Sequence, residues 1–166
     1  MAIMDTTKIF KISIGCALAG CIFHLVGLAT PIWTSQWSDL LLSLTGPHSG
    51  LFTKCGIFFC EPNPQTESWF KATQAFAILG VLAGFASLVV TVLYLQYEKL
   101  KTDIMYKAAV GGHIAAAVFI FLAVVIYGAK AIGNLALSFG LSIVGMLFHA
   151  VAGILMGIDK FKTIPQ

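Results

Sequence analysis

Charged residues are confined to short clusters along this chain, and the intervals between the clusters are long and apolar. No Asp, Glu or Lys occurs at positions 12–38, 72–97, 108–129 or 131–158. A helix needs roughly 20 residues to cross about 30 Å of hydrocarbon, and each interval exceeds that length. The pattern predicts one domain over residues 1–166 with four transmembrane helices at about 10–30, 74–96, 108–128 and 137–158.

The composition agrees with this assignment. Apolar residues make up 58% of the chain, charged residues only 10%, and the mean hydropathy is +0.92. Soluble domains carry about 25% charged residues, so the excess apolar surface here requires a lipid bilayer as its solvent. All the basic residues are Lys, and Arg, the side chain best suited to phosphate and base recognition, is absent. A soluble enzyme, a nucleic-acid partner and a disordered regulator are therefore disfavoured.

The lysines predict the orientation. If the first helix runs outward, only Lys54, Lys71 and Lys130 lie outside the cell, and the other lysines are cytosolic. The positive-inside rule then places both termini in the cytosol. A cleaved signal peptide is the alternative for the N-terminal segment, since Gly27 and Ala29 imitate a cleavage site. The apolar run before them is longer than a usual signal core.

Functional chemistry outside the cell must come mainly from one long loop, residues 31–72. Alternating segments such as Ile32-Trp33-Thr34 and Gly50-Leu51-Phe52-Thr53 are typical of short strands. Gly46-Pro47 and Pro62-Asn63-Pro64 interrupt them with turns. We therefore expect a mainly α membrane protein, a four-helix bundle with a small extracellular antiparallel β-sheet formed by this loop.

The four cysteines occupy two chemical settings. Cys55 and Cys60 lie in the outer loop, on the oxidising side of the membrane, and with no other cysteine there we expect a mutual disulfide across a tight hairpin. A zinc site would need more ligands than His48 supplies, and the spacing differs from the Cys-x-x-Cys of redox sites. Cys16 and Cys21 lie within the first span, where packing is expected; palmitoylation of Cys16 is the alternative.

The outer loop resembles the signature of a known family. Trp33, Gly50-Leu51-Phe52, Cys55 and Cys60 are similar to the claudin motif W…G-L-W-x-x-C…C. Segments 71–75 and 138–142 resemble the openings of the second and fourth spans in claudins and in peripheral myelin and epithelial membrane proteins. The resemblance covers essentially the whole chain and places it in the claudin-like superfamily, which also includes channel gamma-subunits. It implies a plasma-membrane protein at cell–cell contacts, with homotypic or claudin-like partners in cis and trans.

The sequence departs from the claudin pattern at several points, which favours a divergent member of that superfamily. Phe52 replaces the expected Trp, and the spacing of the two cysteines is about half that of claudins. The second outer loop, residues 129–136, is short. The chain ends in Thr163-Ile164-Pro165-Gln166, without the terminal apolar residue by which claudins engage PDZ scaffolds, so no PDZ partner is expected.

The charges of the outer loop bear on permeability if this loop lines a paracellular path. Asp39, Glu61 and Glu67 outnumber Lys54 and Lys71 by one. This balance predicts at most a weak preference for cations.

Three histidines, His24, His113 and His149, fall at membrane depth, where polar residues are functional candidates by default. A haem or metal bridge between His113 and His149 is one hypothesis, if the third and fourth spans are adjacent. Neutral histidines hydrogen-bonded inside the bundle are the interpretation that we favour.

Small residues recur at helix spacing in two spans. Gly80 and Gly84 form a G-x-x-x-G pair in the second span, and Gly153 and Gly157 form another in the fourth. Such spacing permits close approach of two helix backbones. We expect it to serve packing within the bundle, with dimerisation as the alternative.

Three classes of function follow. The first, which we favour, is a structural junction or adhesion protein that forms or tunes a paracellular barrier through its first outer loop. The second is an auxiliary subunit of a membrane channel or receptor. The third is a membrane enzyme of the thiol-redox or cytochrome type, which requires reactive cysteines or haem ligands that the pattern lacks. We therefore expect no enzymatic activity and no cofactor.

Overall fold

The computed structural model of the chain describes residues 7–36 and 46–163, with side chains described as far as Lys160. These residues form four long helices, α1 (Lys8–Ala29), α3 (Ser68–Gln96), α4 (Asp103–Lys130) and α5 (Leu137–Thr163). All four are long and apolar enough to cross a membrane, which confirms the predicted spans. Helix α3 begins at Ser68 rather than at about residue 74, so the last residues of the predicted outer loop are helical.

Local chemistry sets where the helices start and stop. The side chain of Thr7 accepts a hydrogen bond from the Phe10 amide at the start of α1, and Thr102 does the same for Met105 at the start of α4. Each satisfies one of the amides that lack a partner in a first helical turn. Helix α1 ends at Ala29, just before the residue that precedes Pro31, a position that disfavours helical backbone.

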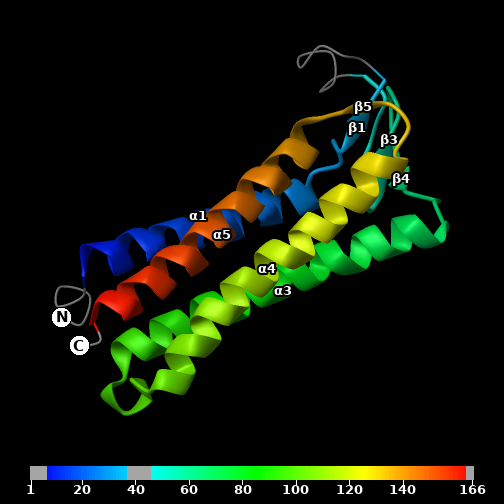
Figure 1. The fold of residues 1–166 in the computed structure, drawn as a ribbon. Coiled ribbons are helices and arrows are strands. Elements are labelled where there is room, and N and C mark those ends of the chain that lie inside the picture. Colours follow the sequence, from blue (N-terminus) through cyan, green and yellow to red (C-terminus); the bar gives the residue numbers. More distant parts are fainter. Residues whose placement is uncertain (1–6, 37–45, 164–166) are drawn as a thin grey trace.

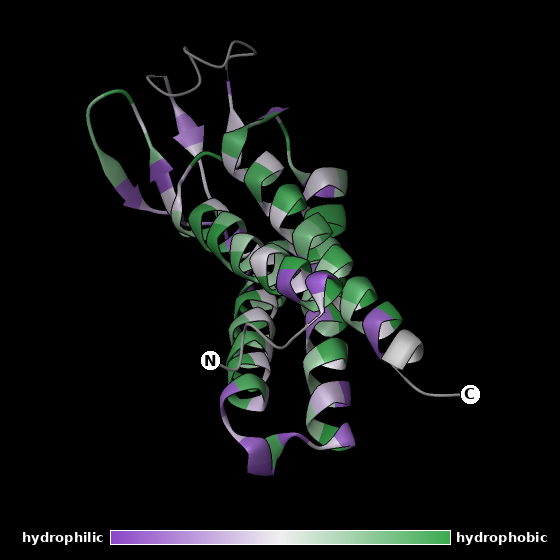
Figure 2. Ribbon diagram, turned by 90° about the vertical axis from the view of Figure 1, so that its left-hand side faces the viewer, coloured by the Kyte–Doolittle hydropathy of each residue, from purple (hydrophilic) through white to green (hydrophobic). Residues whose placement is uncertain are grey.

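The helices associate as two pairs. Helix α1 packs most extensively against α5 and α3 against α4; contacts between α4 and α5 join the pairs, and α1 meets α3 over a smaller surface. Figure 1 shows the sheet at one end of the bundle, which we call the sheet end. Helix α1 begins and α5 ends at the opposite end, the terminal end, where a 3₁₀ turn, η1 (Glu98–Leu100), connects α3 to α4. Apolar side chains cover the outer faces of the helices, and polar residues gather at both ends (Figure 2).

The sheet has five short antiparallel strands in the order β4-β3-β2-β1-β5. The strands are β1 (Thr34–Ser35), β2 (His48–Ser49), β3 (Thr53–Cys55), β4 (Cys60–Pro62) and β5 (Asn134–Leu135). The predicted antiparallel sheet is therefore confirmed. Strand β5, which pairs with β1, comes from the connection between α4 and α5, so the sheet joins both loops at this end.

The predicted strand boundaries need correction. Strand β1 begins at Thr34 rather than Ile32, and Gly50 lies outside the strands, followed by a bend at Leu51 and Phe52. The alternation in these segments arises because Trp33 and Leu51 are both buried in the bundle, with no measurable exposure. Trp33 and Leu51 therefore hold the sheet against the helices, and neither residue is part of a strand.

Glycines on two helices make room for the ring of His149 on α5. A Cβ atom built at Gly84 on α3 would lie 2.8 Å from this ring, and one at Gly20 on α1 would lie 3.0 Å from it. His149 is itself almost fully buried. The small residues thus let a large polar side chain pass between helices, where any larger residue would collide with it.

Other glycines of the predicted pairs differ in what they contact. A Cβ at Gly80 would lie 2.6 Å from Ile120, and one at Gly153 would lie 2.7 Å from Ile114, so both allow close approach to α4. At Gly157 a Cβ would meet no described atom within 4 Å. Close packing within the bundle therefore accounts for Gly80, Gly84 and Gly153, and the expectation does not extend to Gly157.

We predict that Gly84→Ala destabilises the bundle by about 1–3 kcal/mol, because the added methyl group overlaps the confined His149 ring. Gly111→Ala is the matched control: Gly111 is exposed on α4, and a Cβ there would meet no described atom within 4 Å. The free energy of unfolding in detergent should fall only for the first variant. Equal stability of the two variants would contradict the packing of His149 against α3.

Candidate functional site at the sheet end

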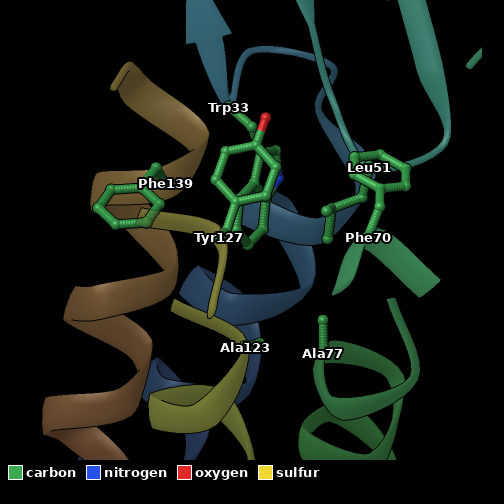
Figure 3. Close-up of a cluster of buried hydrophobic side chains, with 7 residues drawn as sticks. All are labelled: Trp33, Leu51, Phe70, Ala77, Ala123, Tyr127 and Phe139. Atoms are coloured by element: carbon green, nitrogen blue, oxygen red, sulfur yellow. The ribbon is translucent and has the colours of Figure 1, made fainter. Parts of the chain in front are cut away.

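Trp33 attaches the sheet to the helices. Its side chain is fully buried, and its indole Nε1 donates a hydrogen bond of 2.8 Å to the carbonyl oxygen of Gly27. Figure 3 shows the ring among side chains of α4 and α5, and it meets Tyr127 and Phe139 edge-on at centroid distances of 4.9 and 5.9 Å. One residue next to β1 therefore contacts three of the four helices.

The bond from Trp33 has a specific cause in the backbone. The Gly27 carbonyl would accept a helical hydrogen bond from the residue four positions on, which is Pro31, and proline has no N–H. Because a carbonyl left without a donor inside the bundle is costly, the indole N–H of Trp33 replaces the missing donor.

Gly50 and Leu51 make the second attachment. Leu51 is fully buried in the same cluster, close to Phe70 (Figure 3), and its carbonyl accepts a 2.6 Å hydrogen bond from the Gln74 side chain on α3. A Cβ atom at Gly50 would lie 2.5 Å from the backbone of Pro31, so only glycine fits. Together with Trp33, these motif residues hold the sheet against the bundle. Phe52, the fourth motif residue, is 43% exposed.

The hairpin of β3 and β4 forms one edge of the sheet, and β5 forms the other. Cys55 and Cys60 face each other in the strand register and are joined by a disulfide, as the sequence predicted. The Gly56 amide donates a 2.9 Å hydrogen bond to the Phe59 carbonyl and closes the loop. A covalent bond and a backbone bond therefore fix the four residues between the cysteines.

This fixed loop presents apolar side chains away from the protein. Ile57, Phe58 and Phe59 are 68%, 92% and 70% exposed, and we call these three residues the hairpin tip. Figure 2 shows the tip clear of the four helices, at the sheet end. The spacing of the cysteines predicted the hairpin, but it did not predict the exposure of the residues between them. Their signal was three large apolar residues within one short, cysteine-bounded loop.

The charged residues singled out in the loop lie in different places. Glu61 is exposed on β4, directly opposite Lys54 on β3. Glu67 occupies the position before α3, and its carboxylate accepts a hydrogen bond from the indole of Trp69 rather than from a backbone amide of the first turn. Lys54 and Glu67 line a cavity of about 320 Å³ between the sheet and the ends of α3 and α4, whereas Glu61 is not among its lining residues. Asp39 lies outside the described residues.

The histidines and the free cysteines lie within the bundle. The Nδ1 atoms of His113 and His149 are 3.3 Å apart, and Nε2 of His24 lies 3.0 Å from the carbonyl oxygen of Ala77. The third and fourth spans are thus adjacent at this depth. In the part of the chain that the structure describes, no three His, Cys, Asp or Glu side chains are grouped to hold a metal ion. Cys21 is buried and Cys16 half-buried, and neither forms a disulfide.

The chain is a four-span integral membrane protein, with four membrane-spanning helices and, at one end, a small sheet that contains a disulfide. The chain is similar to the lens fiber membrane intrinsic proteins of Rattus norvegicus and Mus musculus, each 28% identical over 126 residues, or 75% of this chain and 70% of the relative. The protein of that name from Homo sapiens is 25% identical over the same shares. No protein-family model matches the chain. This distant similarity to membrane proteins agrees with the resemblance of the sequence to the claudin-like superfamily.

We predict that Trp33→Phe lowers the free energy of unfolding by about 1–3 kcal/mol, because the Gly27 carbonyl loses its donor in a buried position. The matched control is Trp69→Phe, which removes an indole N–H that is paired with an exposed carboxylate. Its cost should be smaller, since water can replace that bond. Thermal unfolding in detergent measures both, and a larger effect at Trp69 would contradict the role of Trp33.

We predict that replacing both Cys55 and Cys60 by Ser destabilises the hairpin by about 2 kcal/mol, the entropy contribution expected for so short a loop. Trypsin cleavage after Lys54 should then become faster, because this residue lies in the strand that the disulfide holds. Cys16→Ser, which changes a free cysteine, is the control. Unchanged cleavage at Lys54 in the double variant would show that the disulfide does not restrain the hairpin.

Proposed function

We propose that this chain is a structural membrane protein of cell–cell junctions, which forms or tunes a paracellular barrier through its sheet end. In this proposal the sheet lies outside the cell, both termini lie in the cytosol, and the protein resides in the plasma membrane at contacts between cells. The distribution of lysines supports the orientation. The similarity to intrinsic membrane proteins of lens fibres supports the membrane role. No catalytic role is part of the proposal.

The observation that carries the proposal is the exposed hairpin tip. Ile57, Phe58 and Phe59 project at the sheet end, away from the helices that lipid covers. Apolar groups exposed to water together in this way are typical of protein contact sites. The disulfide holds the tip in one conformation, so little conformational entropy is lost when a partner binds. A homotypic or claudin-like partner, in cis or in trans, is the expected ligand.

Charge next to the tip would act on ions that pass along such a contact. Glu61 is exposed on β4, close in sequence to the tip, and Lys54 lies opposite it. Because the two charges are neighbours of opposite sign, the field of Lys54 partly offsets that of Glu61. This pairing supports a weak cation preference at most.

An auxiliary subunit of a channel or receptor is the second candidate. The hairpin is short and stands at the edge of the sheet, a position from which the tip can meet a larger membrane protein beside it. Purification in mild detergent distinguishes the two functions. A junction protein should recover copies of itself or claudin-like partners, whereas an auxiliary subunit should recover one larger protein at fixed stoichiometry.

We predict that Phe58→Ser abolishes enrichment of the protein at contacts between two expressing cells, because it removes the most exposed apolar side chain of the tip. The matched control is Ile132→Ser, at the 98% exposed position on the other loop of the sheet end, which should leave enrichment intact. Fluorescence microscopy of the tagged protein, in cultures that mix expressing and non-expressing cells, measures this enrichment. Enrichment where only one neighbour expresses the protein, or no loss in the Phe58 variant, would reject the homotypic proposal.

A further inference from the structure

The terminal end of the bundle contains a second cavity, on the opposite side of the membrane from the sheet. Its volume is about 340 Å³, and residues from all four helices line it. In Figures 1 and 2, the ends of α1 and α5 lie apart from the connection between α3 and α4 at this end. The cavity therefore lies where the two helix pairs diverge and where α1 and α3 share little contact.

The inner wall of the cavity is aromatic. Phe10, Tyr94 and Tyr106 contact one another with ring centroids 5.4 to 6.3 Å apart, and Leu95 lies beside them. The hydroxyl of Tyr106 donates a 2.6 Å hydrogen bond to the Met156 carbonyl, which fixes the orientation of its ring. This wall suits methylene groups and the face-on approach of a cation.

Four charged side chains complete the lining, two of each sign: Lys101, Lys160, Asp103 and Asp159. Such a set does not favour a simple anion, because the aspartates would repel it, nor a simple cation, because of the lysines. It suits a ligand that carries both charges close together. Since the cavity lies at the ends of spanning helices, at the depth of lipid headgroups, a membrane lipid can reach it.

The ion pairs formed by the lining residues indicate where each charge of such a ligand would bind. Asp103 pairs with both Lys160 and Lys107, and Thr7 donates a hydrogen bond to Asp159. The ammonium group of Lys160 lies 5.2 Å from the centroid of the Tyr106 ring, so the aromatic wall accommodates a primary amine. The pair between Lys107 and Asp103 is exposed, so a ligand amine can replace Lys107 at small cost. Lys101 pairs with Glu98, whose side chain is 83% exposed. Exposed pairs of this kind contribute little stability, so Lys101 can exchange Glu98 for a phosphate oxygen at small cost.

We propose that this cavity binds the headgroup of a zwitterionic phospholipid of the ethanolamine type, with its phosphodiester facing the lysines and its amine facing the aspartates. The aromatic wall receives the glycerol and the first methylene groups. The site goes beyond the proposed junctional function and does not depend on it. The same chemistry, a phosphodiester joined to an amine, occurs in soluble glycerophosphoethanolamine, so the experiment must separate the two sources.

Native mass spectrometry of the full chain in detergent tests the proposal, with phosphatidylethanolamine and phosphatidylglycerol added at equal concentration. The ethanolamine lipid should bind roughly fivefold more, because only its headgroup supplies an amine to the aspartates. Lys101→Gln should weaken that binding about tenfold, the loss expected for one charge-assisted bond to phosphate. Lys99→Gln is the matched control: it removes the same charge two residues earlier, within the 3₁₀ turn that Lys101 follows, and Lys99 is not among the lining residues of the cavity.

Asp103→Asn is the second variant, and it should bring binding of the two lipids close to equality by removing the acceptor of the amine. Equal binding of both lipids to the unsubstituted chain, or equal losses in the Lys99 and Lys101 variants, would overturn the proposal in favour of general surface charge. Equimolar glycerophosphoethanolamine should not displace the lipid. Displacement would overturn the assignment to a lipid and indicate a soluble phosphodiester instead.

Discussion

The hydrogen bond from the Trp33 indole to the Gly27 carbonyl is the contact on which the sheet depends. Pro31 ends the first helix and leaves that carbonyl without its helical donor, and a membrane interior supplies no water to replace it. The Trp33 indole supplies the missing donor, and its ring packs edge-on against both Tyr127 and Phe139. Strand β1 follows directly and pairs with β2 on one side and β5 on the other. The helix end, the aromatic cluster and the strand order thus depend on one another.

The apolar residues of the long loop serve two opposite purposes. Trp33 and Leu51 are fully buried and hold the sheet against the helices, whereas the hairpin tip is exposed. Hydropathy alone does not separate these groups, since all their members are large and apolar. The two groups differ in their position in the fold. Trp33 and Leu51 lie next to strands at the end of the bundle, whereas the hairpin tip connects β3 to β4 at the edge of the sheet. The buried group holds the sheet in place, and the exposed group is the one to which the proposed function assigns contact with a partner.

The four spans and the cysteine pairing could be predicted because each depends on local information: the length of an uncharged run, and the number of cysteines on one side of a membrane. Strand β5 could not, because two residues carry no periodicity and become a strand only when β1 lies beside them. The contact between His113 and His149 required knowledge of which helices are neighbours. The side chains that line the cavity at the terminal end are far apart in sequence, so no motif within one segment predicts the cavity.

The position of the β3–β4 hairpin at the margin of the sheet has an evolutionary consequence. Among the described residues, strand β4 ends the strand order with β3 as its neighbour, and its loop projects away from the helices (Figure 2). Relatives with longer or shorter hairpins can therefore keep the same scaffold, because changes in this loop leave the anchoring tryptophan and the inner strands untouched. The residues that hold the sheet against the helices and the exposed residues of the hairpin tip occupy separate parts of the chain, so selection can alter the tip while it preserves the scaffold.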